Sequence, residues 1–462
     1  MTSRTSALLA VPLAVLLAAA SVACGSAPAD TSAAPADEPL ASATITGGTN
    51  TGSQPQTTSP VSGPSAQLLG DGSGDGSGKA SSGGDLAPAS SSAGNDVASA
   101  AATPAPGAPP SLERQVAAKL GLGTNFLVGL GNDNTASSDE NLAGAYTLGQ
   151  KLDIHYLYLA GMNWPSWNSP AGSYVTIHAN AAKAHGVVPM FTLYQAASYG
   201  ENNLGAFDTD SFMTQYWAGV RLLFQKLGAF GAPAMVHVEP DLWGFAQRHS
   251  EQPSGTPMKV GSLVPECSDL PSDVSGMARC VIRLSRQLAP KVVIGLSASS
   301  FGAYSNGYSD PTRIGNFMKS IGAADGDITV LETLDRDAGC FEKASDGNCQ
   351  RGGSFYWDEA NVAHPNFHDH LAYAKIIRNV IGKPLLWWQM PLGVPANTAG
   401  YTGHYRDNRV RYFFNHPGEF AAVGGIGAVF GTGAVHQTDV TSDGGQFKNA
   451  VTGYYAAPAA LP

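Results

Sequence analysis

The chain has 462 residues and a formal net charge of −10, and 13% of its residues are charged, about half the share found in an ordinary soluble domain. All the aromatic residues lie at or after Phe126, so the first quarter of the chain has almost nothing from which to build a core. The segment from Ser111 onward is long enough for one large domain or two small ones. Composition therefore excludes a mainly disordered protein, a coiled coil and a polytopic membrane protein.

The N-terminal segment predicts export. Arg4 precedes an apolar run over residues 7–20, which is too short to span a bilayer comfortably and is typical of a signal peptide, expected here over residues 1–23. The small residues in front of Cys24 resemble a bacterial lipobox, in which the cysteine is lipidated, although Ser21 stands where Leu is usual. We therefore expect a lipoprotein at the cell surface or outer membrane, anchored to the membrane through Cys24, with plain secretion as the alternative.

Residues 24–110 predict a flexible tether, because Gly, Ala, Pro, Ser and Thr dominate and no aromatic residue occurs. The linker carries a charge of −6 and the signal peptide +1, which leaves −5 for the domain expected over residues 111–462. This mild negative charge contains no basic stripe, so we expect no nucleic-acid partner. We expect a monomer without a cofactor or a bound metal.

Four further cysteines predict disulfide bonds, since an exported domain lies in an oxidising compartment. The short spacings favour Cys267–Cys280 and Cys340–Cys349, and other pairings stay open from the sequence. A zinc site would need CxxC-type spacing, which is absent.

Short runs rich in β-branched and aromatic residues predict eight strands: Gly123–Val128, Ile154–Leu159, Val187–Leu193, Ala234–Glu239, Lys291–Leu296, Ile328–Glu332, Pro384–Gln389 and Gly425–Phe430. Helix-like segments that stop at Gly or Pro lie between most of them: Asn180–His185, Ser211–Leu227, Ser272–Leu288 and Phe367–Ile381. This alternation predicts a (β/α)8 barrel of the TIM type. A doubly wound open sheet is the rival, and it would usually bring a GxGxxG turn, which this sequence lacks.

Barrel enzymes carry their active sites where the strands end, so the residues there are the candidate substrate-binding groups. Five of the seven tryptophans fall at these ends, and flat indoles suit the apolar faces of sugar rings. The alternative is that some of these rings fill the top of the barrel. The predicted substrate-binding residues at the rim are Trp164, Trp167, Tyr194, Trp243, Trp387, Trp388 and Gln389.

The end of the fourth strand is the strongest single segment. Alternation places Val236 and Val238 toward the helices, and His237 and Glu239 toward the barrel axis. A carboxylate at the top of an apolar strand is costly to bury unless it is paired or functional. We therefore predict a catalytic role for Glu239, with a structural cap as the alternative, and a substrate-binding role for Asp241.

The end of the sixth strand supplies the second group of acids. Strand six is not adjacent to strand four, so acids on the two strands can face one another across the mouth. Glycoside hydrolysis needs such a pair, one group to protonate the leaving oxygen and one to act as base or nucleophile. We predict Glu332 or Asp335 as the partner acid, and Asp337 as a substrate-binding residue, with Arg336 able to neutralise an Asp beside it.

The run Val238-Glu239-Pro240-Asp241-Leu242 resembles the strand-end Glu-Pro-Asp of family 6 cellulases, which are inverting enzymes with a distorted barrel. The chain departs from this family at one segment, and it does not fit a second, retaining group of barrel enzymes either. The segment Tyr194–Ser198 stands where that family carries an acid, and Gln389 stands where a large retaining clan carries a glutamate after strand seven. Over roughly Leu120 to Phe447 the chain is thus similar to exported (β/α)8 glycoside hydrolases as a superclass, without a family.

We expect the chain to cleave a polysaccharide with a pair of carboxylates at the mouth of the barrel, and the resemblance favours an inverting mechanism. The rival function is a surface lipoprotein of the same fold that binds glycan without cutting it. No GxSxG elbow or HExxH motif occurs, so serine esterases and zinc peptidases lack their usual signatures here.

Overall fold

The computed structural model describes residues 109–131, 140–200, 202–305, 308–334, 336–343, 349, 355–395, 404–434 and 436–462. The expected signal peptide, Cys24 and the linker lie outside the described residues. Within the described part of the chain, no helix has the length and apolar character needed to cross a membrane.

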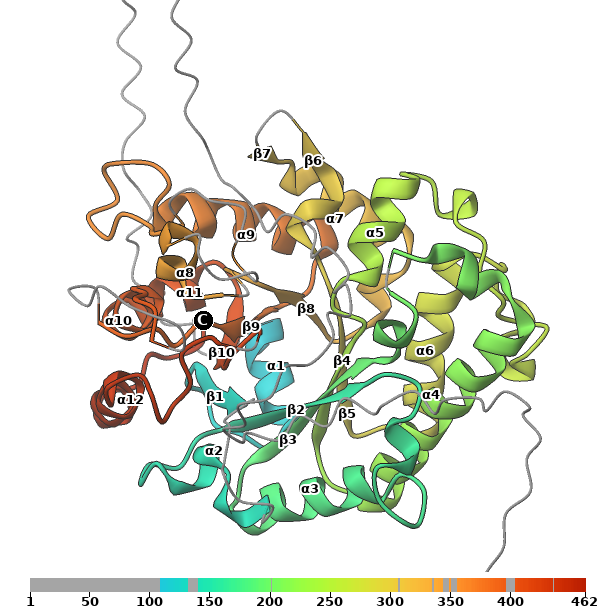
Figure 1. Cartoon of the computed structure of the whole chain (residues 1–462), viewed down its shortest axis with the longest axis horizontal. Helices are drawn as coiled ribbons and strands as arrows, with labels where there is room; N and C mark the ends of the chain where they lie inside the picture. Colours follow the sequence, from blue (N-terminus) through green and yellow to red (C-terminus); the bar gives the residue numbers. More distant parts are fainter. Residues whose placement is uncertain are drawn as a thin grey trace, which may run out of the picture. The chain divides into compact units, whose positions relative to one another are not determined.

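Eight parallel strands close into a barrel in the order β1-β10-β9-β8-β5-β4-β3-β2, which confirms the predicted (β/α)8 fold (Figure 1). The strands are β1 (Leu127–Gly131), β2 (Ile154–Ala160), β3 (Val188–Tyr194), β4 (Ala234–Val238), β5 (Val292–Ser297), β8 (Ile328–Leu331), β9 (Leu385–Met390) and β10 (Gly425–Phe430). Strands β6 (Tyr304–Ser305) and β7 (Tyr308–Ser309) form a separate antiparallel pair in the loop after β5.

Seven of the eight predicted strands match the observed strands to within one residue at either end, and the exception is β1. The sequence favours Gly123–Val128, whereas the strand runs over Leu127–Gly131. A side chain on Gly129 would lie 2.4 Å from Val429, and one on Gly131 would lie 2.3 Å from Tyr156. These glycines let the neighbouring strands pack closely, so residues that indicate a turn in the sequence are part of the sheet.

Most of the larger helices cover the outside of the barrel, whereas α1 (Leu112–Lys119) packs Val116 against the inner layer of the core (Figure 1). The other larger helices are α3 (Ser173–Ala184), α4 (Asp210–Phe230), α5 (Leu242–His249), α6 (Val274–Leu288), α7 (Pro311–Ser320), α9 (Phe367–Ile381) and α12 (Gln446–Ala456). The shorter helices are α2 (Gly144–Thr147), α8 (Ala338–Lys343), α10 (Arg409–Asn415) and α11 (Pro417–Ala422). The predicted helix Phe367–Ile381 is confirmed as α9, where Asn366 and Asp369 form a capping box at its start.

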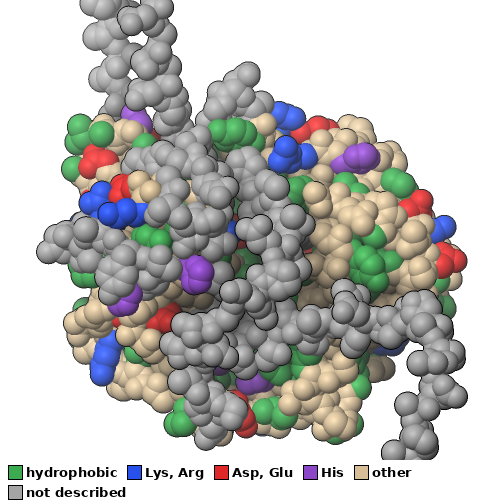
Figure 2. All heavy atoms as spheres, in the orientation of Figure 1, with side chains coloured by type: hydrophobic (Ala, Val, Ile, Leu, Met, Phe, Trp, Pro, Cys, Tyr) green, Lys and Arg blue, Asp and Glu red, His purple; other side chains and the backbone are tan. Residues whose placement is uncertain are grey.

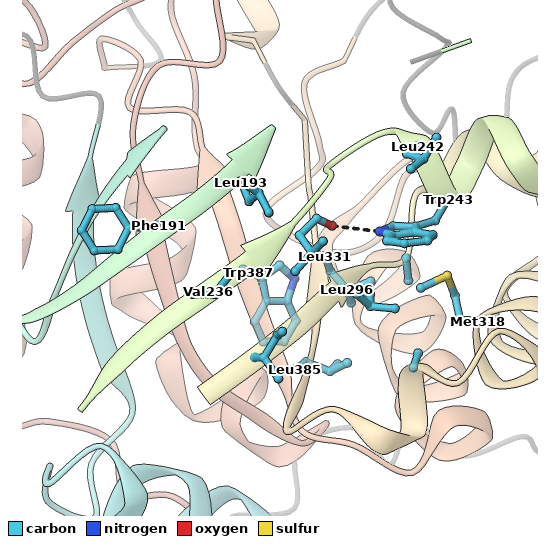
Figure 3. Close-up of a cluster of buried hydrophobic side chains, with 14 of the residues drawn as sticks. Phe191, Leu193, Val236, Leu242, Trp243, Leu296, Met318, Leu331, Leu385 and Trp387 are labelled. Carbon is cyan, nitrogen blue, oxygen red and sulfur yellow. Dashed lines mark hydrogen bonds between the residues drawn. The ribbon is translucent and has the colours of Figure 1, made fainter. Parts of the chain in front are cut away.

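The core has two layers, one inside the barrel and one between the barrel and the helices. Met235, Val330 and Leu386 belong to the inner layer, whereas Val236 and Val238 belong to the outer one. The outward direction predicted for these two valines is therefore confirmed. Figure 3 shows part of the outer layer, where Trp243 and Trp387 lie among aliphatic side chains from several strands.

Both predicted disulfide bonds are present, Cys267–Cys280 and Cys340–Cys349. The first lies between a 3-10 turn and helix α6, and the second ties α8 to the segment that follows it. On the face drawn in Figure 2, acidic and basic side chains of the described residues are interspersed, without a large area of one sign.

Candidate active site

Aromatic side chains gather in the upper part of the barrel, near the ends of strands β2, β3 and β9. Tyr158 lies in the same direction along β2 as Ile154, which belongs to the inner layer. Its ring centre is 5.7 Å from that of Trp388 and 6.0 Å from that of Tyr194. Tyr158 and Tyr194 are half-buried, so this aromatic group extends from the interior to the solvent.

A hydrogen bond crosses the barrel at this level. The Tyr158 hydroxyl donates to Oε1 of Gln389 over 2.6 Å, although β2 and β9 are separated in the barrel by β1 and β10. Gln389 is buried and has a φ of 55°, a left-handed conformation that is uncommon for a residue with a side chain. Positive φ at a strand end redirects the side chain, and here the result is a tyrosine–glutamine bridge under the mouth.

Two carboxylates at the mouth affect the pKa of Tyr158. Burial is the largest cause that raises the pKa of its phenol well above the ordinary value, and the negative charges of Glu332 and Asp241 add to that effect, while Arg336 opposes it. Glu332 follows β8 and Asp241 follows β4, with only β5 between these strands in the barrel. Both residues are half-buried and in contact with solvent. The ends of β4 and β8 thus carry two accessible acids whose negative charges both raise the pKa of one tyrosine.

Glu239 lies in a different environment. Its side chain is fully buried, and Oε1 accepts from the backbone N–H of Gln195 at 3.0 Å. Oε2 accepts from the N–H of Ala196 at 3.2 Å, so the carboxylate binds the first turn of the 3-10 helix Gln195–Ser198. Its charge also adds to burial in raising the pKa of Tyr216 on α4. These contacts are those of a structural cap, the alternative considered for Glu239 from the sequence.

The conformation of Glu239 explains this placement. Strand alternation would aim its side chain at the barrel axis with His237, but its φ is 47°. The left-handed turn at the end of β4 brings the carboxylate instead to the start of the segment after β3. Alternation from one strand residue to the next applies only while the backbone stays extended, and it ends one residue before Glu239.

Three predicted sugar platforms are buried. Trp164, Trp243 and Trp387 have no exposed surface, and each indole N–H donates to a buried acceptor. Figure 3 shows the bond from Trp243 to the carbonyl oxygen of Val238. The predicted stacking role is therefore wrong for these three side chains in this structure, because they pack between the barrel and its helices.

The remaining two tryptophans lie at different depths. Trp388 faces the barrel interior and is 1% exposed, while Trp167, at 37% exposed, has a ring open to solvent. Trp167 packs edge-on against Tyr174 with ring centres 5.0 Å apart, which holds its position beside the end of β2. Of the predicted tryptophan platforms, Trp167 is the accessible one.

Asp337 is buried away from solvent. Its Oδ2 accepts from the N–H of Thr438 at 2.7 Å, and its side chain is 1% exposed. Burial, followed by the charge of Asp407, raises the pKa of Asp337 to about 8. Asp407 in turn pairs with the buried Arg409 at 2.9 Å. The predicted substrate-binding role is therefore wrong for Asp337 in this structure, since its contacts join α8 to the segment after β10.

Asp335, the other proposed partner acid, lies outside the described residues. Among the residues that are described, no group of three or more His, Cys, Asp or Glu side chains is arranged to hold a metal ion. Sequence reasoning missed Tyr158 and Thr192, although alternation along β2 and β3 could have placed both toward the barrel axis.

No family model matches the chain, and no curated protein matches it. Among solved structures, the chain is similar to a Cellulomonas fimi endo-β-1,4-mannanase double mutant, at 12% identity over 76% of this chain and 79% of that one, with a TM-score of 0.46. It is also similar to the GH26 domain of a Prevotella bryantii endo-β-mannanase/endo-β-glucanase, at 11% identity, 74% and 93% coverage and a TM-score of 0.43. The activities in these names belong to those proteins, and the barrel of this chain is established by its own strand pairing.

Proposed function

We propose that the chain is a glycoside hydrolase that cleaves a polysaccharide at the mouth of its barrel. The observation that carries this proposal is a pair of half-buried carboxylates, Asp241 and Glu332, which follow strands β4 and β8 at the same end of the barrel with only β5 between them. Exposed or half-exposed aromatic rings of Trp167 and Tyr194 lie at the ends of the neighbouring strands β2 and β3. Carboxylates beside aromatic rings suit a ligand whose rings have apolar faces and hydroxyl edges.

The proposed chemistry divides the work between the two acids. One carboxyl group protonates the glycosidic oxygen that leaves, and the other acts at the anomeric carbon, directly or through a water molecule. We assign this work to Glu332 and Asp241, because both have access to solvent. In this proposal Glu239 has a positioning role, since its carboxylate fixes the turn that follows Tyr194.

We further propose that the mechanism inverts the anomeric configuration. Support comes from the Glu-Pro-Asp run that resembles the inverting family 6 cellulases and that contains Asp241. Inversion needs a water molecule between the acid that acts as base and the anomeric carbon. Proton NMR of the freshly released sugar distinguishes the two mechanisms, because inversion releases the anomer opposite to that of the substrate bond.

The direct test is a panel of plant, fungal and bacterial polysaccharides incubated with the purified protein, with detection of new reducing ends. New reducing ends on at least one polymer support the proposal. Binding to a polymer with no release of reducing ends would instead favour the rival function, a surface protein that holds glycan without cutting it.

The export and membrane anchorage expected from the N-terminal sequence remain part of the proposal. A lipid on Cys24 would hold the barrel at a membrane surface, and residues 24–110 would give it reach toward an insoluble polymer.

A further inference from the structure

Four side chains with polar atoms lie close together inside the barrel, just below the mouth. Tyr158, Thr192 and His237 stand in one register row on β2, β3 and β4, since Tyr158 pairs with Thr192 and Thr192 pairs with His237. Trp388 reaches the same place from β9, and its ring centre is 4.6 Å from that of His237. Below, these four residues are called the inner row.

Most polar atoms of the inner row lack a partner among the described residues. Both ring nitrogens of His237, the hydroxyl of Thr192 and the indole N–H of Trp388 are buried without a hydrogen bond. A buried polar group left in this state destabilises the fold, because it has lost its hydrogen bonds to water and gained none in return. A cluster of such groups is therefore expected to bind something that satisfies them.

The chemistry of the inner row defines what it can bind. Burial lowers the pKa of His237 to about 3, so its imidazole is neutral near pH 7, with one nitrogen that donates and one that accepts. Thr192 can do both, and Trp388 can only donate. None of these groups carries a charge, so the cluster favours a neutral ligand group. That group should both donate and accept hydrogen bonds, which a hydroxyl group can do.

Position favours a hydroxyl of the substrate. The inner row is closed to solvent at Thr192, His237 and Trp388 and reaches it at the half-buried Tyr158. That tyrosine is the residue on which Asp241 and Glu332 act. Asp241 follows β4, the strand that carries His237, so a sugar ring seated against the two acids would lie at the same end of the barrel as the inner row.

We infer that Thr192, His237 and Trp388 form the floor of the substrate site and bind one hydroxyl group of the sugar. This inference rests on the proposed function and adds to it a determinant of which sugar is accepted. A sugar that lacks a hydroxyl in this direction leaves the floor unsatisfied and binds less tightly.

The test compares two threonines whose buried hydroxyl groups both lack a hydrogen-bond partner among the described residues. Thr192→Val removes the hydroxyl from the inner row, and Thr329→Val removes an equally buried, unpartnered hydroxyl from β8. Thr329 lies between Ile328 and Val330, which face the interior, so its own side chain faces the helices. Calorimetry with cello-, manno- and xylohexaose gives Kd for the wild type and each variant, and His237→Phe is measured in parallel.

We expect Thr192→Val and His237→Phe each to weaken the tightest of these oligosaccharides roughly tenfold, the effect of one lost hydrogen bond, and Thr329→Val to change its Kd less than twofold. Equal Kd values for the wild type and Thr192→Val would overturn the inference while leaving the proposed function intact, because an internal water would then suffice as the partner.

A second measurement decides the inference if none of the three oligosaccharides binds. Protein labelled with 15N-histidine is titrated with glycerol, a neutral polyol, and the nitrogen signals of His237 are followed, with His237→Phe used to assign them. Saturable movement of these signals supports a hydroxyl site at the inner row. Signals that stay fixed up to molar glycerol would overturn it.

Discussion

Glu239 and Asp241 are two residues apart, yet their environments suit them to different roles. Backbone N–H groups hold the Glu239 carboxylate in a fully buried site, whereas Asp241 is half-buried at the mouth. A buried charge that is well hydrogen-bonded is costly to alter, because its partners are left unsatisfied. We therefore propose that the same chemical group stabilises the fold at position 239 and takes part in catalysis at position 241.

This contrast predicts that substitutions at the two positions affect stability to different extents. Glu239→Gln should lower the free energy of unfolding by about 1–3 kcal/mol, because the amide weakens the bonds to Gln195 and Ala196. Asp241→Asn, the matched control, should change it less, because the Asp241 carboxylate is half-buried and partly solvated, not fully buried. Urea denaturation measures both. Equal stability of Glu239→Gln and the wild type would contradict the capping role.

Asp337 predicts a dependence of stability on pH. Burial raises its pKa to about 8 in the folded protein, against an ordinary value of 3.8, so the folded state binds the proton more tightly than the unfolded state does. The resulting stabilisation is complete below about pH 4 and is lost as the pH rises toward about 8. Asp337→Asn has no proton to lose, so it should gain about 3–4 kcal/mol on the wild type between pH 5 and pH 8. Urea denaturation at both values checks this, and a constant difference would contradict it.

At the scale of whole elements, local pattern predicted the barrel well. Strand β10 and helix α9 have the bounds expected from the sequence. Each is followed directly by a glycine, which marks where the element ends. Strand β1 was misplaced because Gly129 and Gly131 serve close strand packing, which depends on neighbours far along the chain. Local signals do not contain that information.

Sequence patterns predicted the candidate site less completely than the fold, because they do not give the backbone angles at the strand ends. The strand ends were located correctly, but the direction of each side chain there depends on backbone angles that pattern does not give. The left-handed conformations of Glu239 and Gln389 redirect both side chains. Trp164, Trp243 and Trp387 likewise show that a tryptophan near a strand end can face the helices as well as the mouth.

Helix α9 offers a test at the scale of one element. Its capping box joins the Asn366 side chain to the N–H of Asp369, and the Asp369 carboxylate to the N–H of Asn366. Asn366→Ala should lower the free energy of unfolding by about 1–2 kcal/mol, the usual cost of a lost cap. Lys375→Ala, an exposed change on the same helix, should cost less than about 0.5 kcal/mol. Thermal denaturation of both variants decides whether the cap stabilises the domain as expected.

At the scale of the whole molecule, the sequence before the barrel is expected to determine whether the protein stays on a membrane or enters the medium. If Cys24 carries a lipid, Cys24→Ser should move the protein from the membrane fraction to the medium, because the hydrocarbon chains are then absent. Cell fractionation followed by immunoblotting measures the distribution. Equal membrane retention of Cys24→Ser and the wild type would show that the anchor lies elsewhere, and release of both would favour plain secretion.

The proposal that Glu332 is a catalytic acid at the mouth of the barrel has one most direct test. This test is the turnover of Glu332→Gln on a polysaccharide that the wild type cleaves. The substitution keeps the shape of the side chain and removes its proton chemistry, so the protein should keep its thermal stability and its affinity for the polymer. Turnover should fall by about a thousandfold or more, because the lost group acts in the transition state. Near-normal turnover by a folded Glu332→Gln would contradict the account, and the catalytic acids would then have to lie elsewhere on the rim.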